Sequence, residues 1–248
     1  MKNRKSDNKE LSVMGHLKEL RSCLTRTVIA LLVAIPIAFY AAKYAFDILM
    51  KPVPGIELVY TEVTEMLGTY AKVTLIIAVV LILPFIVYQA VTFVRPALTK
   101  RERSYVYIML PAIVICFLIG ATFAYLILLP PALNFLFTFG SDIAEPMIKV
   151  GNYVSVLTTL IFWIGLCFEI PIVMFFLTKI GIIKPEWLSK FRKAAYVIAF
   201  VLGAVITPTF DPINQTLVAV PVIFLYEFGI ILSKIARSRK KSADLANS

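Results

Sequence analysis

Charged residues and several chemically active side chains are scarce in this sequence. Of its 248 residues only 16% are charged, and His16 is the single histidine. The three cysteines, Cys23, Cys116 and Cys167, lie far apart and form no CxxC pair. A soluble domain has about 25% charged residues, so this composition argues against a soluble globular fold. One histidine and scattered cysteines also exclude a histidine-rich cluster and favour isolated thiols over a disulfide framework or a zinc site, so we predict no metal.

Motifs of nucleotide and hydrolase chemistry are missing as well. The sequence contains no GxxxxGK[ST] phosphate loop, no HExxH and no GxSxG. A Ser–His pair inside the membrane is excluded in practice, because His16 precedes the first apolar run. We therefore expect no enzyme and no cofactor, and a function in binding, gating or passage.

Apolar residues are abundant: they make up 60% of the chain, and the mean hydropathy is +0.86. Residues 73–94 form a run of 22 without a charge, long enough for a hydrocarbon core of about 30 Å. Pro130-Pro131 is predicted to end the third helix near Leu129, and Pro208 to shorten the fifth. We predict one all-α membrane domain of six helices, the last two short. The predicted spans are about 22–43, 70–94, 104–129, 151–178, 194–207 and 212–233, with mobile tails at 1–10 and 238–248.

The net charge of +10 reflects how the chain is oriented in the membrane. The predicted spans place 21 lysines and arginines on the side that holds both termini and four on the other side. By the positive-inside rule both termini are cytoplasmic, in a multi-pass protein of the cell (cytoplasmic or inner) membrane. Because topology accounts for the basic excess, we predict no nucleic-acid partner.

Three acidic residues lie within or beside the predicted spans. Glu169 is intramembrane, which makes it a functional candidate by default, and Pro171 predicts a kink beside it. A structural hydrogen bond to a neighbouring helix is the alternative. For Glu227, about six residues from the cytoplasmic end of the last span, structure and function both stay open. Asp211-Pro212 is typical of a helix start, with Asp as N-cap and Pro at the first helical position.

Two acids stand out on the basic cytoplasmic side. Glu19 lies in the amphipathic segment 16–21, and Glu102 lies in Lys100-Arg101-Glu102-Arg103. Each carboxylate could form a bidentate pair with an arginine guanidinium, which suggests a receptor for a short arginine-containing peptide. Ordinary surface ion pairs, which stabilise little, are the alternative.

Several short motifs in order give the chain a strong resemblance to the TatC family, the multi-spanning receptor subunit of the twin-arginine protein translocase. The resemblance covers roughly residues 14–236. It rests on His16-Leu17-x-Glu19-Leu20-Arg21, the run 61–65 leading to Lys72, Phe93-x-x-Pro96-Ala97-Leu98-x-x-x-Glu102-Arg103, Phe168-Glu169-Ile170-Pro171, Thr207-Pro208, Asp211, Gln215, Pro221 and Tyr226-Glu227.

The resemblance implies a cup-shaped protein that binds twin-arginine signal peptides and, driven by the protonmotive force, exports folded proteins. It implies single-span TatA/TatB-type partners and a homo-oligomer in the assembled complex. Residues fall into three implied groups: the signal-peptide site, a groove for partner subunits, and an outer-loop region linked to assembly. They are, in that order, Glu19, Glu102, Phe93, Pro96 and Leu98; Glu169, Gln215 and Glu227; and Pro52, Glu65 and Asp211.

Two other functions fit part of the sequence. A proton-coupled small-molecule transporter would use Glu169 as its proton carrier, but it predicts a repeat architecture and further polar residues facing Glu169 at mid-membrane, which the sequence lacks. A scaffold that holds anionic lipid on its basic face would leave Glu19 and Glu102 without a role. Twin-arginine export is therefore the favoured hypothesis.

Overall fold

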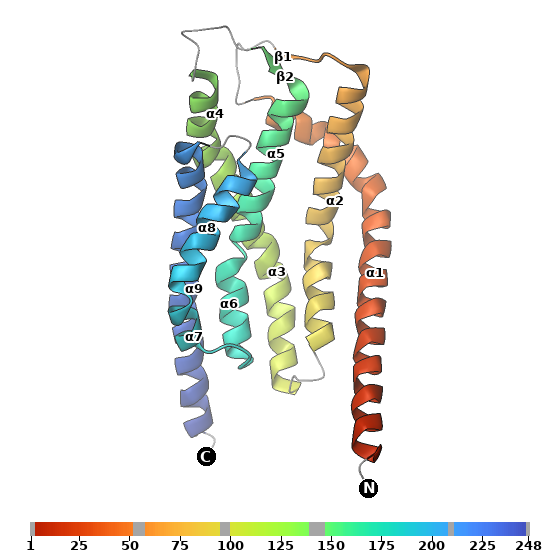
Figure 1. Ribbon diagram of the computed structural model, residues 1–248, viewed down its shortest axis with the longest axis vertical. Coiled ribbons are helices and arrows are strands. Elements are labelled where there is room, and N and C mark those ends of the chain that lie inside the picture. The colour runs from red at the N-terminus through yellow and green to blue at the C-terminus, as the bar shows by residue number, and fades with distance from the viewer. Residues whose placement is uncertain (1–2, 52–57, 95–99, 139–146, 208–210, 247–248) are drawn as a thin grey trace.

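The chain forms long helices that stand side by side along one axis (Figure 1). This computed structural model describes residues 3–51, 58–94, 100–138, 147–207 and 211–246. In chain order the elements are α1 (Asn3–Leu49), β1 (Leu58–Val59), α2 (Val63–Val94), α3 (Lys100–Phe123), η2 (Ala124–Leu128), α4 (Leu129–Thr138), β2 (Ile148–Lys149), α5 (Val150–Cys167), α6 (Ile170–Lys179), α7 (Pro185–Lys190), α8 (Arg192–Ile206) and α9 (Pro212–Ala246).

The apolar runs of the sequence form these helices, so the predicted all-α membrane fold is confirmed. Five segments in the described part of the chain are long and apolar enough to cross a membrane: Lys18–Leu49, Val63–Phe93, Met109–Thr138, Val150–Lys179 and Pro212–Ser238. The fifth predicted span, 194–207, corresponds to α8 (Arg192–Ile206), which has 15 residues. At 1.5 Å per residue α8 reaches about 22 Å, less than the hydrocarbon core.

The last helix differs from the prediction that both final helices are short. α9 has 35 residues and runs past residue 233 to Ala246. Its polar end is rich in lysine, arginine and alanine, which are good helix formers in water, so nothing ends the helix where its apolar part ends. The start of α1 and the end of α9 lie at the same end of the bundle (Figure 1). Residues 3–10 and 238–246 are helical, and the mobility of the two tails stays a prediction.

A second correction concerns Pro130-Pro131. The helix does not end near Leu129 but continues as α4 to Thr138. The π-helical turn η2 precedes the prolines, and the N–H of Leu129 donates to the carbonyl of Ala124, five residues earlier. Because this turn interrupts the regular ladder, the prolines fall in the first turn of a new helical segment. The first turn of a helical segment is where a proline, which has no N–H to donate, is best tolerated.

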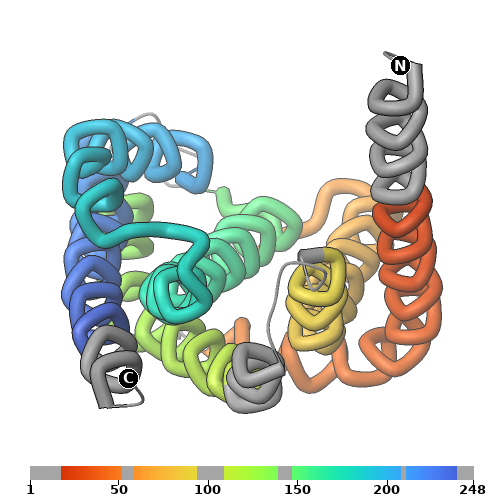
Figure 2. The backbone as a smooth tube through the Cα atoms, turned by 90° about the horizontal axis from the view of Figure 1, so that it is seen from below, coloured from red at the N-terminus to blue at the C-terminus, as the bar shows by residue number. Residues whose placement is uncertain are grey.

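Small residues let neighbouring helices approach closely. Ala34 and Ala38 of α1 pack against Ala78 of α2. Between α6 and α9, a Cβ on Gly229 would lie 2.5 Å from the sulfur of Met174. Such close packing is what holds helices together in lipid, where apolar burial drives little association. α1 and α2 form one side of the bundle, α8 and α9 the other, and α3, α5 and α6 lie between them (Figures 1 and 2).

Candidate functional site

The residues predicted to bind the signal peptide belong to α1, α2, α3 and the connection between the last two. Glu19 is exposed on α1, and Phe93 is partly buried in the last turn of α2. Glu102 belongs to the first turn of α3, whereas Pro96 and Leu98 lie outside the described residues. The end of α2 and the start of α3 lie at the same end of the bundle as the start of α1 (Figure 1). The fold therefore gathers the motif-bearing segments at one end.

At the opposite end of the bundle, the connection between α1 and α2 is hydrogen-bonded to the connection between α4 and α5. β1 and β2 pair in parallel. One oxygen of the Glu65 carboxylate accepts the N–H of Gly151 at 2.9 Å, and the other accepts the N–H of Thr61 at 3.1 Å and its hydroxyl at 3.4 Å. A Cβ on Gly151 would lie 2.8 Å from the carboxylate oxygen that accepts its N–H, so a larger residue there would displace this carboxylate. Glu65 thus ties the first connection to the start of α5, while Pro52 lies outside the described residues.

Asp211 caps α9, as its sequence context predicts. One carboxylate oxygen accepts the N–H of Asn214 at 2.7 Å, and the other accepts the amide of the Asn214 side chain at 3.1 Å. The carbonyl of Asp211 accepts the N–H of Gln215 at 3.2 Å. Pro212 is the first helical residue, where its missing N–H is not needed. The capping role of Asp211 is confirmed.

Gln215 lies at a close approach between α8 and α9. Its side-chain amide donates to the carbonyl of Phe200 at 2.9 Å. A Cβ on Gly203 of α8 would lie 2.7 Å from the backbone oxygen of Gln215. Since α8 is shorter than the hydrocarbon core of a bilayer, close packing against α9 helps to hold it in place.

We expect Gly203→Ala to lower the free energy of unfolding by about 1–3 kcal/mol. The added methyl group would meet the backbone oxygen of Gln215, which cannot move unless α9 moves. Thermal unfolding of the detergent-purified protein measures the loss. The matched control is Gly68→Ala, because a Cβ added there would meet no packing neighbour within 4 Å. This substitution should leave stability unchanged or raise it, since alanine favours the helix. Equal unfolding temperatures for Gly203→Ala and the unmodified protein would contradict the close contact.

Glu169 lies in the break between α5 and α6, and Pro171 is the second residue of α6, so the regular helix is interrupted beside the acid, where a kink was predicted. The residue is 7% exposed. Neither carboxylate oxygen has a hydrogen-bond partner among the residues that the structure describes. A Cβ on Gly120 of α3 would lie 2.7 Å from the ring of Phe168, so α3 packs closely against the break. The acid is therefore enclosed by protein; the backbone N–H of Phe117 on α3 lies near its carboxylate but does not complete a hydrogen bond to it.

The sequence profile of the family described as Sec-independent protein translocase protein (TatC) matches residues 15–221. The chain belongs to the TatC family. It is 42% identical over 238 residues to the Sec-independent protein translocase protein TatC of Aquifex aeolicus (strain VF5), covering 93% of this chain and 98% of that one.

Two further similarities agree with the membership. The TatC of Carboxydothermus hydrogenoformans is 36% identical over 240 residues, which cover 96% of this chain and 99% of that one. A crystal structure described as the twin arginine translocase receptor TatC superimposes with a TM-score of 0.79 at 42% identity, covering 89% of this chain and 99% of that chain. The chain is accordingly a multi-span membrane protein of the TatC type.

Glu227 of this TatC-family chain has two partners on α8. Its carboxylate accepts a hydrogen bond from the guanidinium of Arg192 at 2.8 Å and from the hydroxyl of Tyr196 at 2.7 Å. The next residue back, Tyr226, donates from its hydroxyl to the carbonyl of Leu188 at 2.8 Å. These contacts join α9 to α7 and α8. They support a structural role for Glu227, which is one of the two roles that the sequence left open.

Sequence reasoning missed Gln89. It is 5% exposed on α2, and its side-chain oxygen has no hydrogen-bond partner in the described part of the chain. Its polar amide side chain within the uncharged run 73–94 is the feature of the sequence that could have identified it. Arg192 and Tyr196 were also missed as partners of Glu227, because 35 and 31 residues separate them from it.

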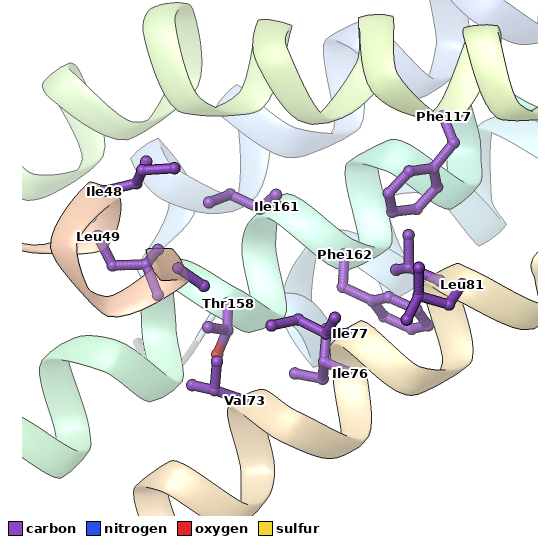
Figure 3. A pocket seen from close by; sticks show the side chains of 12 residues that line it. Ile48, Leu49, Val73, Ile76, Ile77, Leu81, Phe117, Thr158, Ile161 and Phe162 are labelled. Carbon is purple, nitrogen blue, oxygen red and sulfur yellow. The ribbon is translucent and has the colours of Figure 1, made fainter. Parts of the chain in front are cut away.

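An apolar cavity of about 250 Å³ lies between the end of α1 and the helices α2, α3 and α5. Ile48, Val73, Ile161 and Phe162 are among its lining side chains (Figure 3). Its polar lining residue, Thr158, donates its hydroxyl to the carbonyl of Val154 at 2.7 Å. A binding site for a hydrophilic solute needs convergent polar groups, so this cavity gives no support to the small-molecule transporter alternative.

Proposed function

We propose that this chain is the receptor subunit of a twin-arginine translocase, which binds signal peptides at the end of the bundle that holds the start of α1 and the end of α9. The observation that carries the proposal is the match to the TatC family over residues 15–221. The crystal structure that superimposes on this chain is described as a twin arginine translocase receptor.

The charge distribution supports recognition of an arginine pair at that end. With 21 basic residues on the proposed cytoplasmic side, a cationic peptide is repelled except where carboxylates are available. Glu19 and Glu102 supply two such groups, on α1 and α3. Each would accept a guanidinium in a bidentate, charge-assisted pair, and Phe93, Pro96 and Leu98 would shape the neighbouring loop.

The same charge asymmetry supports the orientation in the membrane. With four basic residues on the other side, the positive-inside rule places both termini in the cytoplasm of a cell with this translocase in its cytoplasmic or inner membrane. The helices then cross six times, with α8 as the short crossing.

The remaining candidate residues would serve assembly. Glu169, Gln215 and Glu227 are proposed to contact single-span TatA/TatB-type subunits, and Pro52, Glu65 and Asp211 to organise the outer side for signal-peptide insertion. The assembled complex would contain several copies of this chain and use the protonmotive force to export folded proteins.

Removal of this chain from its cell should leave a folded twin-arginine reporter in the cytoplasm. The measurement is the fraction of reporter exported, before and after the chain is restored on a plasmid. A reporter with two lysines in place of the arginine pair is the matched control, and it should stay inside in both strains. Export that continues undiminished without the chain contradicts the proposed function.

A further inference from the structure

An open cleft of about 530 Å³ lies between the short helix α7 and the polar part of α9. The two helices lie side by side in the half of the bundle that holds both termini (Figure 1). Four of the six residues that line the cleft carry a hydroxyl or a cationic group. The lining residues are Pro185, Glu186, Ser189, Lys234, Arg237 and Ser238. The signal-peptide and partner candidates described above lie elsewhere, so the proposed function gives this cleft no role.

The cleft carries a net positive charge. Arg237 forms an ion pair with Glu186 across it. The backbone N–H of Glu186 itself and, after it, the guanidinium of Arg237 hold the pKa of the Glu186 carboxyl below its usual range, so this acid is ionised and cancels one positive charge. Lys234 is exposed and forms no ion pair in the part of the chain that the structure describes. One positive charge therefore remains unbalanced.

Exposed aromatic side chains on and directly after α7, the helix that forms one wall of the cleft, indicate that the cleft lies at a membrane surface. Trp187 on α7 is 54% exposed, and Phe191, the residue after α7, is 64% exposed. On the inner side of the same helix Pro185 is buried, and the carbonyl of Leu188 is held by Tyr226. Exposed tryptophan next to basic side chains is typical of the boundary between headgroups and acyl chains.

We propose that this cleft binds the phosphate of an anionic phospholipid, with Lys234 as its main cation, Ser189 and Arg237 as hydrogen-bond donors, and Trp187 against the upper acyl chains. A phosphodiester offers acceptors to all three donors. The positive charge of the cleft repels a choline or other cationic headgroup, so an acidic lipid such as phosphatidylglycerol is favoured. A free phosphate has no acyl chains and would gain nothing from Trp187.

The fluorescence of Trp187 tests the proposal directly. The chain has two tryptophans, so Trp163→Phe leaves Trp187 as the only tryptophan. In nanodiscs of phosphatidylcholine, brominated phosphatidylglycerol should quench Trp187 at a mole fraction at least about fivefold lower than brominated phosphatidylcholine, as expected for about one basic residue near a surface. Equal quenching by both lipids overturns the proposal, whatever the variants do.

Charge variants should shift this preference in opposite directions. Lys234→Glu should abolish it, whereas Glu186→Gln should increase it about fivefold, because Arg237 then loses its neutralising partner. Lys43→Glu, an exposed lysine on α1 outside the cleft, is the matched control and should change nothing. A Glu186→Gln variant that keeps or lowers the preference contradicts the electrostatic argument even if Lys234→Glu does not fold.

Inorganic phosphate distinguishes a lipid site from a site for any small anion. Added in millimolar amounts, it should not restore Trp187 fluorescence in nanodiscs that contain phosphatidylglycerol. Full restoration identifies a small-anion site only and overturns the assignment to lipid. None of these measurements uses a signal peptide, so their failure leaves the proposed receptor function untouched.

Discussion

Substitution of Glu19 by glutamine should abolish crosslinking of a twin-arginine peptide to this chain while the protein still accumulates in the membrane. The expected loss is at least tenfold in affinity, because hydrogen bonds to a charged group contribute about 1.5–3 kcal/mol each, and 1.4 kcal/mol is tenfold. Loss of the carboxylate also leaves an arginine facing a strongly basic surface. Photo-crosslinking of a labelled peptide to membranes, as a function of peptide concentration, measures the effect. Glu102→Gln should behave in the same way.

The control for this experiment lies on the same helix as Glu19. Asp47 is an exposed carboxylate near the other end of α1, so Asp47→Asn changes the net charge equally but lies away from the proposed site. It should leave crosslinking unchanged. A peptide with two lysines should crosslink weakly to every variant, since an ammonium cannot form the bidentate pair of a guanidinium. Undiminished crosslinking to both Glu19→Gln and Glu102→Gln would remove these residues from the site.

The features that sequence predicts best here are those governed by local physics. Uncharged runs predict the long helices because the bilayer admits few other structures. The cap formed by Asp211 and the kink beside Pro171 follow from backbone groups within a few residues of each. Even the short α8 is evident from Pro208, which limits its length.

Contacts between helices could not be predicted in this way. Glu65 reaches the N–H of Gly151 across 86 residues, and Glu227 reaches Arg192 across 35. Neither pairing leaves a periodic trace in the sequence, because one contact between two helices does not repeat. The same holds for Gly203, whose need for a small side chain is apparent only with α9 beside it.

Pro130-Pro131 illustrates a different limit. Proline in a helix interior removes a hydrogen bond and clashes with a carbonyl one turn earlier, so a helix end was the reasonable prediction. The structure removes the conflict with the π-helical turn η2. Turns of this kind have no distinctive residue pattern, since they depend on how the widened segment packs against its neighbours.

For Glu169 we expect a substitution that raises stability and impairs assembly together. A buried polar group without a hydrogen-bond partner lowers the free energy of unfolding by about 1–3 kcal/mol. Neither carboxylate oxygen of Glu169 has such a partner among the residues that the structure describes. Glu169→Met removes the polar group and keeps an unbranched side chain. The free energy of unfolding should therefore rise by about 1–3 kcal/mol, while recovery of a single-span partner on a tagged TatC-family chain falls several-fold. Thermal unfolding and co-purification from the same membranes give the two values.

Glu227 provides the opposite case, which makes the pair informative. Its carboxylate has Arg192 and Tyr196 as partners, so Glu227→Met should lower the free energy of unfolding. The loss should be only about 1 kcal/mol, because the two charged side chains are 42% and 30% exposed and water screens them. If Glu169→Met lowers stability as Glu227→Met does, then Glu169 stabilises the fold through a partner of its own. A structural role then accounts for this acid. If it raises stability without loss of the single-span partner, the buried acid serves a step other than docking. The proposal requires both results for Glu169→Met: a higher free energy of unfolding and a lower recovery of the single-span subunit. Together they would mean that Glu169 destabilises this chain but is needed to bind that subunit.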